Sequence, residues 1–240
     1  MKKNIILKRI ILLFIFSNFF FQVNVVGMEY TLGISDNDTF IWEIDKLDSE
    51  IYEEVLLTDA NFKEDYQSRI EIDYIEESSE KWRILYFFWD YTGDVRDFED
   101  RPDDYKTRKV YKDPDDQADK IKDLESFAKM WIILNPIIDY IEEFRDGYDN
   151  DFFDVSVDDN TLRMRPAIED IKYEIDITYG DEGIAKMIEY INEDGETFVR
   201  IILLEKTIPG YDIILVLVII FLGGAVSISL WKRKVNFIYT

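Results

Sequence analysis

The 240-residue sequence contains no cysteine and no histidine. Without cysteine there is no disulfide bond and no thiolate nucleophile, so a folded domain here depends on its core or on bound ions. Without histidine, Ser-His-Asp and Cys-His catalysis are excluded, as are the ordinary zinc, copper and haem sites. Any chemistry would therefore have to rest on carboxylates.

Basic residues are also scarce. The chain has 28 lysines and arginines against 51 aspartates and glutamates, a net charge of −23. Fifty of the acidic and 21 of the basic residues lie within residues 28–208, which gives this part a charge of −29. Such a surface repels nucleic acid, so we expect no DNA or RNA partner. The abundant aromatic residues, 15 Tyr and 17 Phe, argue against a disordered acidic tail.

Charge is absent from one long stretch, residues 213–231. As a helix it would span about 28 Å, which matches a hydrocarbon core of about 30 Å. Because basic residues stay on the cytoplasmic side, we predict a transmembrane anchor over 209–231, a cytoplasmic tail over 232–240 and an extracytoplasmic domain over 28–208. A buried core helix is the alternative. The residues that frame the stretch are Ile208, Pro209, Gly210 and Tyr211 before it, and Lys232, Arg233 and Lys234 after it.

The N-terminus agrees with this orientation. Basic residues precede an apolar run over residues 10–21, and a short segment suited to cleavage follows at 25–27. This order is typical of a secretory signal peptide, which we predict over 1–27. An uncleaved N-terminal anchor is the alternative, and either version exports the middle of the chain.

The Ile-Pro-Gly-Tyr motif, the apolar helix and the basic stop together resemble the C-terminal sorting segments of archaeal surface proteins, the PGF-CTERM proteins. The version with tyrosine is similar to that of the Asgard (Lokiarchaeal) group. The resemblance implies that an archaeosortase-like enzyme cuts near Pro209 and Gly210 and passes the protein to a lipid. A permanently anchored single-pass protein is the plainer interpretation.

Small residues four apart within this stretch, Gly223 and Ser227, would allow two helices to pack closely. They indicate dimerisation within the membrane, although small residues are frequent in such helices.

The exported part predicts an α+β domain with a curved antiparallel sheet. Alternating apolar residues indicate strands near 29–34, 40–45, 69–76 and 81–91, a short strand at 106–111, and a meander over 171–204. The run at 81–91 is apolar on both faces, which favours a central strand. Aromatic residues beside acids also describe a sugar-binding surface.

One helix is expected to cover the sheet. Asp113 can cap its start and Pro114 suits its first position. Apolar residues then follow at spacings of three and four as far as residue 141, with Pro136 expected to kink the helix or divide it in two and Gly147 to end it.

Three aspartates, Asp146, Asp149 and Asp151, offer oxygen ligands that would suit calcium. The run lacks the full EF-hand pattern, and solvated turns explain such clusters equally well. Asn37 begins an Asn-Asp-Thr acceptor pattern for glycosylation. Glycoside hydrolysis needs two carboxylates at a fixed separation, and the sequence singles out no such pair.

These observations favour a membrane-anchored, non-enzymatic surface protein, either structural or ligand-binding. It would contact membrane lipid through its C-terminal helix and a surface protein or glycan through its exported domain. A carboxylate-dependent enzyme acting on envelope polysaccharide is the competing hypothesis. A third is a lipid or small-molecule carrier, which would need an apolar cavity between helix and sheet.

Overall fold

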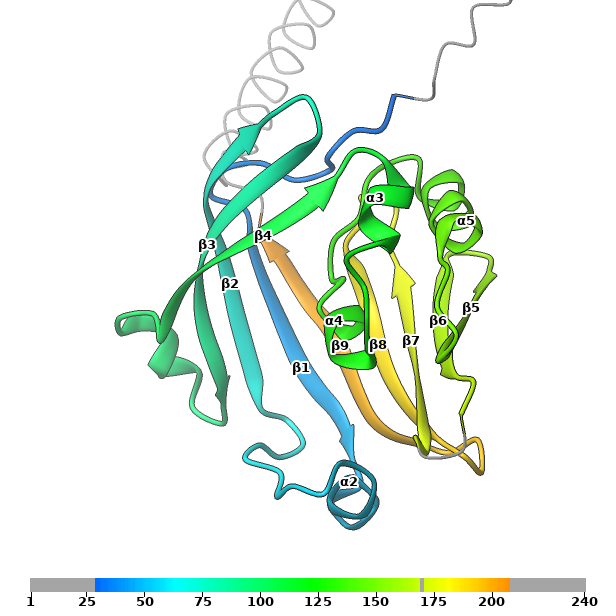
Figure 1. Ribbon diagram of the computed structural model, residues 1–240. Coiled ribbons are helices and arrows are strands. Elements are labelled where there is room, and N and C mark those ends of the chain that lie inside the picture. The colour runs from blue at the N-terminus through cyan, green and yellow to red at the C-terminus, as the bar shows by residue number, and fades with distance from the viewer. Residues whose placement is uncertain (1–28, 169–170, 208–240) are drawn as a thin grey trace, which may run out of the picture. The chain divides into compact units, whose positions relative to one another are not determined.

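The computed structural model describes residues 29–168 and 171–207 (Figure 1). The chain divides into two compact units, residues 1–30 and 31–240, and the second contains every helix and strand described below. The predicted signal peptide, sorting motif, anchor and tail lie outside the described residues.

The second unit is built on one nine-stranded sheet in which all neighbours are antiparallel. Its order is β4-β3-β2-β1-β9-β8-β7-β6-β5, so the first and last strands meet in the middle and join two meanders. The predicted antiparallel sheet is confirmed. The strands are β1 Thr39–Leu47, β2 Gln67–Glu77, β3 Lys81–Thr92, β4 Asp104–Tyr111, β5 Phe153–Asp158, β6 Thr161–Pro166, β7 Tyr173–Tyr179, β8 Ala185–Asn192 and β9 Thr197–Thr207.

The two faces of the sheet differ because side chains alternate along each strand. On β1, Phe40, Trp42 and Ile44 are all at most 4% exposed and face the core. The opposite face carries a row of charged side chains across neighbouring strands, in which each arginine pairs with an acid. Its members are Arg163 of β6, Asp176 of β7, Glu189 of β8, Arg200 of β9 and Asp45 of β1.

The helices are short. Figure 1 shows α3, α4 and α5 together on one face of the sheet, over its β5 to β9 half, and α2 near the end of β1. A 3-10 helix, Val95–Glu99, lies between β3 and β4. The α-helices are α2 Ser49–Leu56, α3 Pro114–Ala118, α4 Leu124–Ala128 and α5 Ile137–Gly147.

The single long helix predicted from Pro114 onward is therefore wrong. Its start is as predicted, with Asp113 capping α3 and Pro114 in the first turn. A new N-cap at Asp123 then begins α4. Pro136 does not kink a continuous helix but, as the alternative had it, marks a division, because it is the N-cap of the separate helix α5. Most of the apolar positions in the pattern are buried. The spacing of the apolar residues therefore predicted which side chains are buried, but not the conformation of the backbone between them.

Residues 130–135, here called the strap, run extended through the core between α4 and α5. Residues 130–134 are each at most 9% exposed, which an amphipathic helix would not allow. The backbone groups of the strap pair with the turn between β7 and β8: the N–H of Ala185 donates to the carbonyl of Trp131 and the N–H of Ile133 to that of Gly183, both at 2.8 Å. The hydroxyl of Tyr179 donates to the carbonyl of Met130 at 2.8 Å.

Other differences from the sequence interpretation are local. The strand expected at 29–34 is only a bridge between Thr31 and Asn135. The hairpin of β5 and β6, turning at Asp159, was missed because its strands are short and half polar. The aromatic strand β3 is second from the edge and not central.

None of the helices within 29–168 and 171–207 has the length and apolar character that a membrane crossing requires.

A buried carboxylate holds the entry to β1. Asp38 is 2% exposed, and its Oδ2 accepts the N–H of Ser35 at 3.0 Å. Lys206, near the end of β9, lies 3.9 Å from the same oxygen and also pairs with Glu182. Burial raises the pKa of Asp38 above its ordinary 3.8, while the Ser35 N–H and Lys206 lower it and Glu182 raises it further.

We expect Gly183→Ala to destabilise the protein more than Gly195→Ala. Both glycines have positive φ, near +80°, and alanine in that region costs about 1 kcal/mol. A Cβ on Gly183 would also lie 2.4 Å from the carbonyl oxygen of Ile133, whereas one on Gly195 meets nothing within 4 Å. Because the Cβ added at Gly183 would displace the strap, the loss in unfolding free energy of Gly183→Ala should be larger by on the order of 1–3 kcal/mol. Urea unfolding of both variants measures the difference, and equal losses would contradict the role given to the strap.

We expect Asp38→Asn to change how stability depends on pH. As pH rises from 3.8 to the raised pKa, the unfolded chain releases the Asp38 proton before the folded chain does, so this carboxyl lowers stability progressively over that window. The unfolding free energy of wild type minus that of the variant should therefore fall with rising pH. Urea titrations of both proteins at a series of pH values measure this, because the other acids are common to both. A difference that grows with pH would contradict the burial effect.

Candidate functional site

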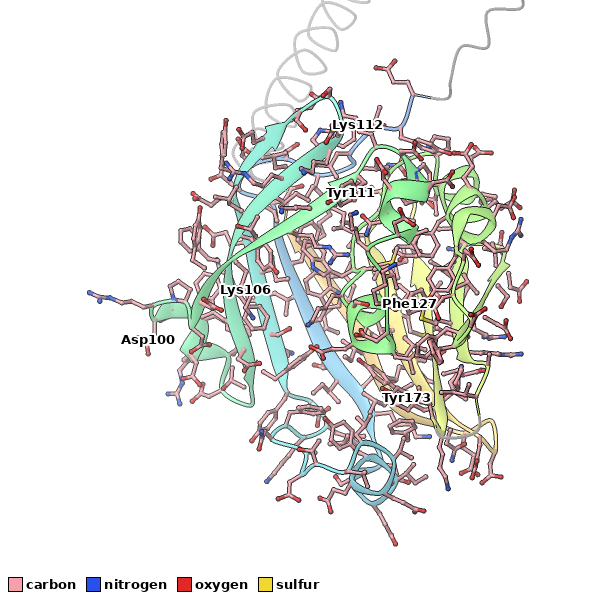
Figure 2. The ribbon with its side chains drawn as sticks, viewed as in Figure 1. Asp100, Lys106, Tyr111, Lys112, Phe127 and Tyr173 are labelled. Atoms are coloured by element: carbon pink, nitrogen blue, oxygen red, sulfur yellow. The ribbon has the colours of Figure 1, made fainter. Side chains whose placement is uncertain are left out.

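A cavity of about 560 Å³ lies between the core-facing side of the sheet and α4 with the start of the strap. Six strands contribute to its wall. Figure 2 shows Lys106 on β4 and Phe127 on α4, two of the elements that border it. The lining residues are Trp42 of β1; Ser68 and Ile70 of β2; Tyr86, Phe88 and Tyr91 of β3; Lys106, Thr107 and Arg108 of β4; Ala128 and Lys129 at the end of α4; Trp131 of the strap; Ile188 and Tyr190 of β8; and Ile201 of β9.

Trp131 forms the centre of the aromatic wall. Its ring lies edge-on to those of Trp42 and Tyr86, with centroids 5.7 Å away in both cases, and 6.2 Å from the ring of Phe40. Edge-to-face pairs at these distances are favourable beyond the area they bury. The Trp42 indole N–H donates to the carbonyl of Ala185 at 3.3 Å, so the turn that holds the strap also orients this ring.

The hydroxyls in the wall are neutral at physiological pH. Burial raises the pKa of Tyr91 to about 12, although a hydrogen bond with Ser68 acts in the opposite direction. Burial likewise raises the pKa values of Tyr190 and Tyr86. These groups give the cavity polar contacts without adding negative charge.

The charged residues of the wall are all basic: Lys106, Arg108 and Lys129. Among the residues that the structure describes, no aspartate or glutamate lines the cavity, although acids outnumber bases 51 to 28 in the chain. The Lys106 ammonium sits 3.6 Å from the centre of the Phe88 ring and 3.9 Å from Asp104. Lys129 pairs with Glu125 at 2.5 Å.

Arg108 differs from both lysines. Among the described residues it has no ion pair and no hydrogen bond, and its Nε is fully buried without a partner. Burial lowers the pKa of its guanidinium, because the tyrosines nearby offer only weak compensation. A cation in this position loses part of its hydration without gaining a counter-ion, which is unfavourable.

A second hollow of about 710 Å³ surrounds the 3-10 helix and is lined by four aspartates, Asp90, Asp97, Asp100 and Asp103, together with aromatic residues. Its carboxylates hold the loop: Asp103 accepts the N–H of Asp90 at 2.8 Å, and Asp97 accepts the hydroxyl of Thr92 at 2.6 Å. Trp89 is only 7% exposed, so it presents no ring face for a sugar to stack on. We therefore interpret this hollow as part of the structure of the loop and not as a binding site.

The predicted calcium ligands are not brought together as a metal site. Within 29–168 and 171–207, no group of three or more acidic side chains is arranged to hold a metal ion. Asp146 is engaged by Arg145, whose Nε and Nη2 donate to it at 2.9 and 2.8 Å. Calcium binding by Asp146, Asp149 and Asp151 stays a prediction without geometric support.

Two further predictions concern the surface and the membrane. Asn37 is exposed in the turn before β1, where φ is +67°, and its glycosylation stays a prediction. Residues 208–211 and 232–234, as well as Gly223 and Ser227, lie outside the described residues.

The sequence interpretation missed the cavity, although one local signal could have indicated it. Lys106, Arg108 and Val110 alternate along β4, so two cations share a strand face with a residue that is 1% exposed. Basic residues on the buried face of a strand are unusual unless something neutralises them.

No family model matches the sequence, and no curated protein is similar to it. Among solved structures, the chain is similar to one in a structure described as "The complex structure of Pseudomonas aeruginosa MucA/MucB", with 12% identity and a TM-score of 0.33. The match covers 75% of this chain and 55% of that one, so this chain spans about half the length of the protein it matches. A likeness this distant assigns neither a family nor an activity.

Proposed function

We propose that this chain is a membrane-anchored, non-enzymatic ligand-binding protein of the cell envelope, and that its ligand occupies the cavity beneath α4. The observation that supports this best is the cavity itself, about 560 Å³ and walled by Trp42, Tyr86, Trp131 and aliphatic residues. Small-molecule sites in proteins are of this size and this mainly apolar character.

The cavity also fits the overall arrangement. One hollow touches six strands, which supports a sheet curved around it. Register shifts in four of the strand ladders are irregularities of the kind that bend and twist strands. A purely structural module would gain stability by filling this volume, because unfilled apolar space costs free energy. A bound apolar group would recover that cost.

Catalysis has no comparable support. A glycoside hydrolase needs two carboxylates across a cleft, and within the described part of the chain no aspartate or glutamate lines the cavity. Two of the four acids of the second hollow, Asp97 and Asp103, hold their own loop. Among the hypotheses that the sequence left open, a carrier or receptor for an apolar molecule is therefore the one that this geometry favours.

The predicted export signal and C-terminal anchor complete the proposal. They would place the cavity outside the cell, close to the membrane surface, because few residues separate the end of β9 at Thr207 from the predicted anchor. A ligand taken from the membrane or from the envelope would then have a short path to the cavity.

We expect Ile201→Trp to abolish binding of a neutral apolar probe. Ile201 lines the cavity, and the added volume would fill it from β9. Ile202→Trp is the matched control, because the next residue on a strand faces the other side of the sheet. Titration of both full-length variants with the fluorescent probe N-phenylnaphthylamine, in identical preparations, should show an affinity lower by about tenfold or more only for Ile201→Trp.

Folding of both variants is checked by their cooperative unfolding in urea. Ala128→Phe fills the same space from α4 and serves as a second variant if Ile201→Trp does not fold. Equal probe binding by the cavity variants and by Ile202→Trp would overturn the proposed function.

A further inference from the structure

We propose that the ligand is a single-chain amphiphile with an anionic headgroup, whose alkyl chain lies in the cavity and whose headgroup pairs with Arg108. This inference rests on the proposed function and adds the chemical class of the ligand.

The first observation is that Arg108 lacks a counter-ion. The other partly buried arginines of the described residues all have a carboxylate within 3.3 Å: Arg69 with Glu71, Arg145 with Asp146, Arg163 with Asp176 and Arg200 with Glu189. Arg108 has none, and its buried Nε has no hydrogen-bond acceptor. A guanidinium offers five donors in a planar fork that matches a carboxylate or phosphate group, so an anionic ligand would satisfy it.

The second observation is that, among the described residues, the groups that act electrostatically on Arg108 are tyrosines and not carboxylates. Tyr86, Tyr140 and Tyr179 lie near Arg108, but burial raises the pKa values of Tyr86 and Tyr179, which keeps their hydroxyls neutral. The Tyr179 hydroxyl donates to the carbonyl of Met130, and that of Tyr140 donates to the carbonyl of Tyr111. Both side chains are thus engaged with the backbone.

The third observation is the position of Arg108 at a junction. It lines both the apolar cavity and a neighbouring hollow of about 630 Å³ between β4 and the helices α3 and α4. Thr107 and Lys129 also line both spaces. The neighbouring hollow is lined by four bases, Arg108, Lys109, Lys120 and Lys129, and by two acids, Asp123 and Glu125. An alkyl chain in the first space would therefore place a headgroup beside Arg108 and Lys129.

The fourth observation is the reversal of charge. Residues 28–208 carry 50 acids against 21 bases, yet the charged members of the cavity wall are three bases. The two lysines already have contacts, with Phe88 and Asp104 for Lys106 and with Glu125 for Lys129. Arg108 is thus the group that gains most from an added anion, since a charge-assisted hydrogen bond in a water-poor site is strong.

The experiment compares three probes of equal chain length on the full-length protein: decanoate, decanol and decylammonium. Each is titrated against bound N-phenylnaphthylamine. Wild type should bind decanoate most tightly and decylammonium least. Arg108→Gln should weaken decanoate about tenfold while leaving decanol unchanged, because only the charged headgroup loses its partner.

Arg83→Gln is the matched control. It makes the same change of charge and residue type on the adjacent strand, where Arg83 is half exposed and pairs with Glu76 on the outer face. It should leave all three affinities as in wild type.

Unfolding measurements separate a binding role from a structural one. Without ligand, Arg108→Gln should unfold at the same temperature as wild type or a higher one, because a partly buried charge without a counter-ion is removed. With decanoate, wild type should gain more in melting temperature than the variant does. A structural arginine would instead lower the melting temperature when replaced.

Each remaining outcome is decisive. If decanol binds as tightly as decanoate and Arg108→Gln changes neither, the headgroup inference is overturned while the apolar cavity stands. If no probe binds and Ile201→Trp changes nothing, the proposed function fails too. Should Arg108→Gln not fold, Arg108→Lys keeps the charge and should retain a preference for decanoate; a folded lysine variant without that preference would also overturn the inference.

Discussion

The pairing between the strap and the turn that joins β7 to β8 is the constraint on which the rest of this structure depends. A segment buried on all sides must satisfy its backbone groups within the protein, and the strap does so through the bonds from Ala185 to Trp131 and from Ile133 to Gly183. These bonds hold Trp131 against the sheet, where its ring meets those of Trp42 and Tyr86. They also fix where α4 ends and α5 begins. The start of this segment, at Trp131, also forms part of the wall of the cavity.

Charge is distributed in two distinct ways on the sheet. On the outer face each arginine meets an acid on a neighbouring strand: Arg163 pairs with Asp176 and Arg200 with Glu189. Both acids are largely covered, with side chains 7% and 15% exposed, so each has a cationic partner where water is limited. In the wall of the cavity the charged residues are three bases, and one of them, Arg108, is unpaired among the described residues. A partly buried arginine without a counter-ion lowers the stability of the protein when no ligand is bound. An anionic ligand would supply the missing counter-ion and remove that cost.

Much of the sheet could be predicted from the sequence because its strands alternate strictly. The apolar residues Phe40, Trp42 and Ile44 of β1 have the period of a half-buried strand, and the glycine turns of the last meander mark its hairpins. The covering helix could not be predicted in the same way. Apolar residues spaced three and four apart fit a helix, yet they fit a chain of short helices and an extended strap as well, because spacing records burial and not backbone conformation. The candidate site was even harder to predict from the sequence, since its wall combines six strands and a helix from distant parts of the chain.

The sequence by itself determined which chemistry is absent, how acidic residues 28–208 are, and that their strands form an antiparallel sheet with one buried face. Those conclusions follow from composition and local periodicity, which need no knowledge of neighbours in space. Only the tertiary structure decided that the strap crosses the core, that no metal ligand set forms among the described acids, and that Arg108 lines an apolar cavity without a counter-ion. These are relations between residues far apart in the chain, and they arise from how strands curve and pack.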